Sequence, residues 1–248
     1  MRRGQAPQAT NGLLQHLVSH WSLYGTINGT VRNCSDSHAG LTMYSGPFKT
    51  TEGTYLWQPY PASRNFTSDR YLYRNAADSI PFRTGDRDFT ICGWVYPFYV
   101  NGTRVMLAKA ISTAIDQTEY ALSHNELNGT DRMLKFQYGN QHVIWGTLET
   151  WQKYMLIAWR EKASKTINIQ VNNGAVVSAN APEIATVLNC GIAISKWGDD
   201  AANSFWQANM QAISIWISEP GAGGALNAAK RTALWNNGQG LRYDQYQP

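Results

Sequence analysis

The stretch Trp151–Ala179 limits the fold of this chain more than any other part of the sequence. It begins with an apolar run of strand length, 153–159, and continues with Thr166–Val171, where isoleucine and valine alternate strictly with polar residues. A period of two marks a half-buried antiparallel strand. The sequence Asn172-Asn173-Gly174 follows, and Asn-Gly tolerates the positive φ angles of a type I′ turn. The stretch therefore predicts three successive antiparallel strands, the third at 175–177.

A second long strand is predicted at Asp88–Phe98, and it is apolar on both faces. One face carries Phe89, Ile91, Gly93 and Val95, and the other Thr90, Cys92, Trp94 and Tyr96. Such a strand is typical of the centre of a sheet that is covered on both sides. Shorter strands are predicted at Leu17–Leu23, 42–46, 54–58, Tyr71–Tyr73, Val105–Ala108, Tyr120–Ser123, Met133–Tyr138, Gly191–Ser195 and Met210–Ile217.

One helix is predicted, near the C-terminus at 226–236. Leu226, Ala229, Ala233 and Leu234 have helical spacing, Asn227 can cap the start, and Gly238 follows the end. About a dozen strands and one terminal helix predict an all-β protein, a two-sheet antiparallel jelly-roll sandwich over residues 13–248. Residues 1–12 form a polar N-terminal arm, which we expect to be ordered only where its own body or a neighbouring chain holds it.

Composition excludes several classes of function. The chain has 248 residues, of which 43% are hydrophobic and only 15% charged, enough for one domain with a full core. A net charge of +4 without a basic cluster argues against nucleic-acid binding. No apolar segment follows Met1-Arg2-Arg3, so neither a signal peptide nor a membrane span is expected. The three cysteines lack the spacing of a zinc site, and their odd number and wide separation imply no disulfide framework; Cys92 is expected to be buried.

Five stretches resemble the laminin G-like branch of the concanavalin A-like lectin and glucanase sandwiches. They are 17–23 (LVSHWSL), 36–42 (DSHAGLT), 84–97 (TGDRDFTICGWVYP), Trp151–Ala179 and 206–243, and they occur in the family's order. The combination of TINIQVNNG with a terminal AAKRTALWNNGQGL is similar to the variety found in environmental bacteria and in bacteriophage virion proteins. The resemblance implies the fold, whereas the same fold carries lectins, glycosidases and adhesion modules.

The strands predicted here lack the groups that a glycosidase requires. Glycosidases use two carboxylates across the scissile bond, and laminarinase-type relatives carry Glu-x-Asp-x-x-Glu on one strand. No Glu-x-Asp occurs in this chain, and Phe89–Tyr96, 153–159 and Thr166–Val171 contain no acidic residue. The five histidines are isolated in the sequence. We therefore expect no catalytic activity.

Two kinds of binding site are expected instead. Family members often hold calcium at the rim of the sandwich, and Asp199 with Asp200 is the best metal candidate, although a solvated turn is the favoured explanation of these residues. Sugars stack on exposed aromatic faces beside polar groups, and the candidates for this are Trp145, Trp197, Tyr138 and Asn203. The alternative for each aromatic residue is ordinary packing in the core.

The resemblance and the arm together indicate a role in assembly. We expect a non-catalytic, virion-associated accessory protein, a capsid-surface or fibre component of a bacteriophage that would also contact host polysaccharide. Arg2, Arg3 and Pro7 of the arm would dock on other virion subunits. The alternative is an extracellular, lectin-like carbohydrate-binding module that depends on calcium.

Overall fold

The chain folds as a two-sheet antiparallel β-sandwich with one short α-helix. The computed structural model describes residues 12–21, 23, 26–27, 30–31, 41–44, 50–52, 62–66, 71–98, 102–112, 114–127, 131–183, 185–197, 206, 208–241 and 245–246. The predicted arm lies outside these residues except for Gly12, as does the strand predicted at 54–58. Within the described residues no helix is long and apolar enough to cross a membrane.

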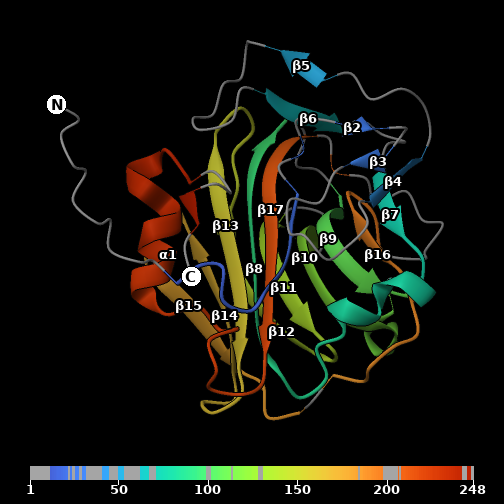
Figure 1. Cartoon of the computed structure of the whole chain (residues 1–248), viewed down its shortest axis with the longest axis vertical. Coiled ribbons are helices and arrows are strands. Elements are labelled where there is room, and N and C mark those ends of the chain that lie inside the picture. Colours follow the sequence, from blue (N-terminus) through green and yellow to red (C-terminus); the bar gives the residue numbers. More distant parts are fainter. Residues whose placement is uncertain are drawn as a thin grey trace, which may run out of the picture.

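Sheet A has eight strands, in the order β15-β14-β13-β8-β17-β6-β5, with β1 also paired to β17 (Figure 1). Its strands are β1 (Leu17–Trp21), β5 (Thr50–Glu52), β6 (Ala62–Phe66), β8 (Asp88–Pro97), β13 (Tyr154–Glu161), β14 (Thr166–Val171), β15 (Val176–Asn180) and β17 (Ala208–Ser218). The two longest, β8 and β17, lie side by side at its centre. The predicted central strand and the predicted three-strand meander, β13 to β15, are confirmed.

Sheet B has nine strands, in the order β12-β11-β10-β9-β16-β7-β4-β3-β2. They are β2 (Thr26–Ile27), β3 (Thr30–Val31), β4 (Leu41–Tyr44), β7 (Tyr71–Arg74), β9 (Arg104–Ala110), β10 (Thr118–Leu127), β11 (Asp131–Tyr138), β12 (Gln141–Thr147) and β16 (Ile192–Ile194). Short 3-10 helices cover Ala77–Phe82, Ile115–Gln117 and Asn236–Gly238. Strand β12 was not predicted, because His142 and Ile144 interrupt a clear alternation of polar and apolar residues.

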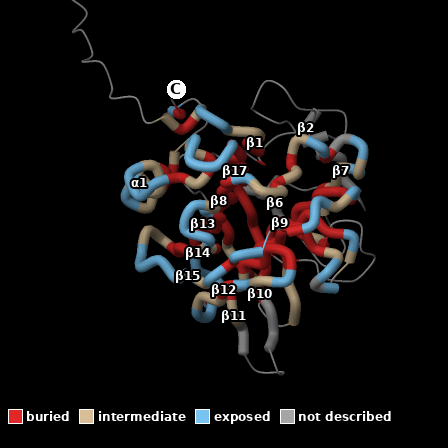
Figure 2. Tube along the Cα trace, turned by 90° about the horizontal axis from the view of Figure 1, so that it is seen from below, coloured by how far each residue is buried: buried red, intermediate tan, exposed pale blue. Residues whose placement is uncertain are grey.

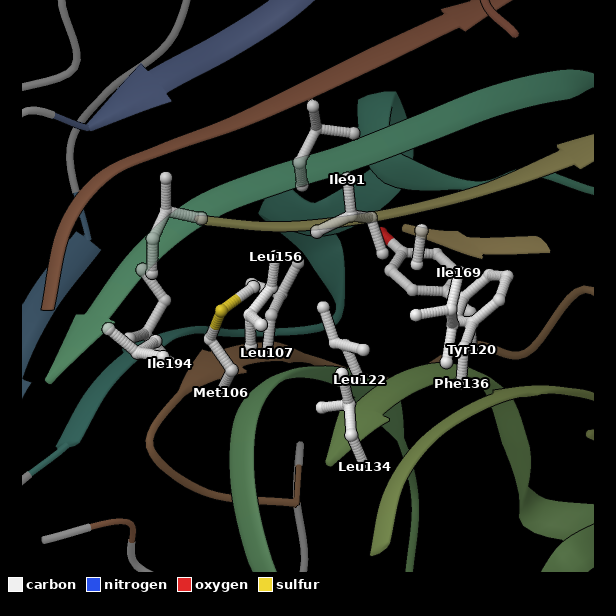
Figure 3. Packing of buried hydrophobic residues seen from close by; sticks show 14 of the residues in the cluster. Ile91, Met106, Leu107, Tyr120, Leu122, Leu134, Phe136, Leu156, Ile169 and Ile194 are labelled. Atoms are coloured by element: carbon white, nitrogen blue, oxygen red, sulfur yellow. The ribbon is translucent and has the colours of Figure 1, made fainter. Parts of the chain in front are cut away.

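The main core lies between the two sheets. Ile91, Leu156 and Ile169 of sheet A point toward Leu107, Leu122, Leu134 and Phe136 of sheet B (Figure 3). The predicted inward residues Phe89, Val95, Ile167 and Val171 belong to the same cluster. Figure 2 shows the buried residues concentrated along the strands and the exposed ones in the surrounding loops.

The second face of sheet A is also covered, which adds a third layer to the sandwich. Helix α1 (Ala228–Trp235) and both ends of the described chain pack on this face (Figure 1). Cys92, Trp94 and Met155 contribute from the sheet, while Leu13, Leu234 and Tyr246 cover them. The Trp216 indole N–H also donates to the Leu13 carbonyl at 2.7 Å. The alternation predicted for β8 is thus confirmed on both faces.

Helix α1 begins as the sequence predicts and ends slightly earlier. The Asn227 side chain accepts a hydrogen bond from the Lys230 N–H at 3.0 Å and so caps the first turn. Asn236 ends the helix in the left-handed conformation, with a φ of 44°, so the helix stops before Gly238. Arg231 fixes the helix to sheet A, because its guanidinium lies 4.1 Å from the centre of the Trp159 ring and donates to Gln170.

Two backbone details complete sheet A. The predicted type I′ turn is present, but its central residues are Asn172 and Asn173, with φ angles of 51° and 57°, rather than Asn-Gly. The Gly174 N–H closes it by donating to the Val171 carbonyl at 2.9 Å. In β17 a bulge follows Gln211, and the adjacent β8 residue is Gly93, whose missing Cβ would lie 3.0 Å from Ile213.

A fully buried histidine in β1 should make stability depend on pH. The His20 ring lies 2.7 Å from the Ser214 hydroxyl, and burial lowers the His20 pKa to about 3. The unfolded chain takes up the proton near its ordinary pKa of 6.5, whereas the folded chain does so only near 3. His20 therefore leaves stability unaffected above pH 6.5 and lowers it progressively between pH 6.5 and 3.

We expect His20 to lower the free energy of unfolding by about 2 kcal/mol between pH 7 and pH 5. Urea unfolding of the wild type and of His20→Gln gives the free energy of unfolding of each protein at the two pH values. The change between pH 7 and pH 5 should be larger in the wild type, and the difference is the contribution of His20. Equal pH dependence in the two proteins would contradict it.

Candidate binding sites at the two ends of the sandwich

An aromatic cluster stands at the end of the sandwich where β8 finishes and β13 begins. It consists of Tyr96, Phe98 and Trp151. The Trp151 ring centre lies 5.2 Å from that of Phe98 and 6.2 Å from that of Tyr96. Trp151 is 58% exposed, which is the largest exposure among the large hydrophobic residues described. We call this cluster the aromatic platform.

The backbone of Trp151 holds its ring away from the core. Its φ of 62° is in the left-handed region, where a bulky residue is uncommon, and its N–H donates to the Pro97 carbonyl at 2.8 Å. Such a conformation costs on the order of 1–3 kcal/mol and is often found at functional sites. The exposed side chains of Glu149 and Gln152 lie beside it in sequence. The platform thus combines an apolar ring face with neighbouring polar groups.

The opposite end of the sandwich contains a polar pocket of about 90 Å³. Its lining comes from the start of β10, the β11–β12 turn and the segment after β15. The lining residues are Asp116, Thr118, Gly139, Asn140, Gln141, Glu183, Ala185 and Thr186. Gly139 has a φ of 55°, and a Cβ there would lie 3.2 Å from Ala185, so glycine permits the close contact between two walls.

A fully buried ion pair lies behind this pocket. Lys109 of β9 and Glu119 of β10 are both 0% exposed, with 3.7 Å between Nζ and Oε2. Lys109 also donates to the Cys190 carbonyl at 2.8 Å and to the Ser79 hydroxyl at 3.2 Å. The pair therefore connects sheet B to the 3-10 helix Ala77–Phe82 and to the segment before β16, since a charge out of water needs several such partners.

Glu119 completes the connection on its own side. It accepts hydrogen bonds from the N–H and the hydroxyl of Thr84 and, at 3.3 Å, from the Leu188 N–H. Burial raises the Glu119 pKa, while the Lys109 charge and these donors act in the opposite direction. Its backbone carbonyl accepts from the Gly139 N–H at 3.1 Å. The backbone carbonyl of Glu119 thus contacts the lining residue Gly139, while its buried carboxyl group holds Thr84 and Leu188.

The structure contradicts the expected exposure of two stacking candidates. Trp197 is only 2% exposed, because it packs against Val105, Ala108, Ala110 and Ala121 on the outer face of sheet B. Tyr138 is fully buried. Its hydroxyl donates to the Gly85 carbonyl, and the Arg160 guanidinium lies 4.8 Å from its ring centre. Neither ring has a free face for a sugar.

Trp145 lies in β12, paired with Leu134. It is partly buried and packs against the main core. Asn203, Asp199, Asp200 and the arm residues Arg2, Arg3 and Pro7 lie outside the described residues. In the described part of the chain no group of three or more His, Cys, Asp or Glu could hold a metal ion.

The functional candidates that the sequence did not reveal are Trp151 and the pocket carboxylates. Trp151 stands in the polar sequence Glu149-Thr150-Trp151-Gln152-Lys153, and this polar setting was the available signal of exposure. Asp116 and Glu183 are separated by several strands in sequence and line the same pocket only in the folded chain. Both are exposed, whereas the general acid of a glycosidase is shielded from water.

Known structures with the same architecture include domains of carbohydrate-active proteins. Domain 4 of AbnA, an extracellular GH43 arabinanase from Geobacillus stearothermophilus, in complex with arabinotriose, has 11% identity and a TM-score of 0.60 over 86% of this chain and 98% of that one. The sialidase of Trypanosoma rangeli has 14% identity and a TM-score of 0.58 over 92% of this chain. This chain spans 34% of the sialidase, about a third of its length.

A heptameric SAP-like pentraxin from Limulus polyphemus is also similar, with 13% identity and a TM-score of 0.50 over 75% of this chain and 80% of that one. At these identities the likeness shows the fold alone. No protein-family model matches the chain, and no curated protein matches its sequence. The chain is thus a β-sandwich of the architecture that these proteins share.

The buried pair gives a prediction about stability. Lys109→Met leaves the Glu119 carboxylate buried without its charged partner, so the variant should lose about 3–5 kcal/mol of unfolding free energy. Adding Glu119→Gln should recover part of this loss, so the two substitutions should show a coupling of more than about 1 kcal/mol. Urea unfolding of the four proteins of this cycle measures the coupling.

The exposed pair Arg87–Glu219 is the matched control for that cycle. Its atoms are 3.4 Å apart, but the side chains are 49% and 75% exposed, so the coupling should be about 0–1 kcal/mol. Equal coupling in the two pairs would contradict a special role of the buried one.

Proposed function

We propose that this protein is a non-catalytic carbohydrate-binding module that holds its ligand on the aromatic platform. The observation that carries the proposal is the exposure of Trp151, fixed by a backbone conformation that costs stability. An aromatic ring stacks on the apolar face of a sugar, while nearby polar groups bind its hydroxyls. Glu149 and Gln152 are the polar groups closest in sequence.

The comparisons support the ligand class without fixing the glycan. One structural neighbour is described in complex with arabinotriose and another is a sialidase. We also propose that the chain belongs to the laminin G-like branch of these sandwiches, which its sequence resembles. We also propose that Asp199 and Asp200 bind calcium and that glycan binding depends on it. Loss of glycan binding in EDTA would support this.

Trp151→Ala should weaken glycan binding at least tenfold, because it removes the stacking surface. Its free energy of unfolding should change by less than about 1 kcal/mol, since the side chain is exposed. A glycan array identifies the ligand, and titration calorimetry with the best glycan measures the affinity. Trp151→Phe is the matched control and should retain part of the binding.

Trp197→Ala tests the candidate that the structure buries. It should lower the free energy of unfolding by about 3–5 kcal/mol, and any loss of binding should follow the loss of folded protein. Wild-type affinity in Trp151→Ala would exclude the platform. Release of reducing ends from the bound glycan would contradict the non-catalytic part of the proposal.

We further propose that the module acts on the surface of a bacteriophage virion, as a capsid-surface or fibre component. The support is the sequence resemblance and the basic arm with Arg2, Arg3 and Pro7. Other virion subunits would hold the arm, and the platform would face host polysaccharide. An extracellular lectin is the alternative placement.

Deletion of residues 1–12 should leave a folded, soluble sandwich that no longer incorporates into particles. Circular dichroism checks the fold, and incorporation is measured in purified particles from the native source. The full-length chain is the control. A secreted monomer that binds glycans would favour the lectin placement.

A further inference from the structure

The polar pocket contains hydrogen-bond acceptors for which the described part of the chain supplies no donor. The carboxylates of Asp116 and Glu183 take part in no ion pair among the described residues. The Gln141 Oε1 atom is shielded from solvent and accepts no hydrogen bond. Its Nε2 atom donates to the Glu183 carbonyl at 3.1 Å, which fixes the amide with its oxygen as the free acceptor. A shielded acceptor without a partner costs about 1–3 kcal/mol.

The lining also supplies no positive charge. It contains no lysine, arginine or histidine. The Thr118 hydroxyl lies 3.3 and 3.2 Å from the Ser112 and Ala114 carbonyls, so its hydrogen is used outside the pocket. The pocket is thus locally negative in a chain of net charge +4.

We propose that the pocket binds a guanidinium group, the head of an arginine side chain. Guanidinium is planar, carries five N–H donors and accepts none, so it can serve two carboxylates and an amide oxygen at once. Such charge-assisted bonds are about twice as strong as neutral ones. Calcium fits less well, because it needs six to eight oxygens and the pocket has only two carboxylates.

The surroundings of the pocket suit an arginine that is part of a peptide. Ile111 is 41% exposed, and its N–H donates to the Gln117 carbonyl at 2.8 Å. Gln117 stands in sequence between the lining residues Asp116 and Thr118, so Ile111 lies close to the pocket. Val187, next to the lining residue Thr186, is 46% exposed. A bound peptide would bury these two apolar side chains beside the charged pocket.

Two sources could provide the arginine. One is the segment before Gly12 of a second copy, with Arg2 and Arg3, and the other is a separate peptide or protein. The pocket and the aromatic platform lie at opposite ends of the sandwich, so binding of arginine in the pocket does not depend on glycan binding.

The experiment titrates acetyl-Arg-Arg-Gly-amide into the full chain carrying Arg2→Gln and Arg3→Gln, which removes the internal competitor. Calorimetry measures affinity, and NMR follows the side-chain amides of Asn140 and Gln141. We expect saturable binding, at least tenfold weaker for the isosteric citrulline peptide and at least tenfold weaker in Asp116→Asn/Glu183→Gln. Glu149→Gln removes an exposed charge at the other end and should change affinity less than twofold.

The sources are separated by repeating the titration with native Arg2 and Arg3. Weaker binding of the peptide identifies the chain's own segment as a competitor, and unchanged binding identifies a separate ligand. Equal binding of the citrulline peptide, no binding at all, or displacement of the peptide by millimolar Ca²⁺ would overturn the proposal. The citrulline comparison uses no pocket variant, so it stands even if the double variant fails to fold. Trp151→Ala should leave peptide binding intact, which separates this result from failure of the glycan proposal.

Discussion

Strand β8 is apolar on both faces, and both faces therefore have to be removed from water. Phe89, Ile91 and Val95 are covered by sheet B, which produces the sandwich. Cys92 and Trp94 require a second cover, which α1 and the two ends of the described chain provide. A sandwich of two sheets alone would leave a large apolar surface on sheet A, and such a surface promotes association. The third layer follows from the composition of this one strand.

The two ends of the sandwich are built on different physical principles. At the pocket end, the buried pair of Lys109 and Glu119 holds the segments around Thr84 and 188–190 through directional hydrogen bonds. At the platform end, ring contacts and one strained backbone position hold Trp151 at the surface. Charge is therefore used for rigidity at one end, while apolar surface is left exposed at the other. The two ends therefore suit different ligands, a glycan at the aromatic platform and an arginine side chain at the pocket.

The sequence predicted those features that depend on neighbours in the chain. A run that is apolar on both faces identified β8, alternation identified β14, and the Asn227 cap identified the start of α1. It failed where burial depends on residues from distant strands. Trp197 is buried by alanines of β9 and β10, and Tyr138 by Gly85 and Arg160, none of which is local in sequence. Trp151 was missed although its polar neighbours in sequence indicated exposure, because the φ angle that accompanies this exposure is visible only in the structure.

The cover of sheet A also determines when this chain can finish folding. His20 bonds to Ser214 across 194 residues, and Trp216 to Leu13 across 203. Contacts of such large sequence separation form slowly, because a long loop must close first. Tyr246, which packs on Trp216, is synthesised after all the strands of both sheets. The N-terminal half therefore keeps part of its apolar surface uncovered until these later residues have been synthesised.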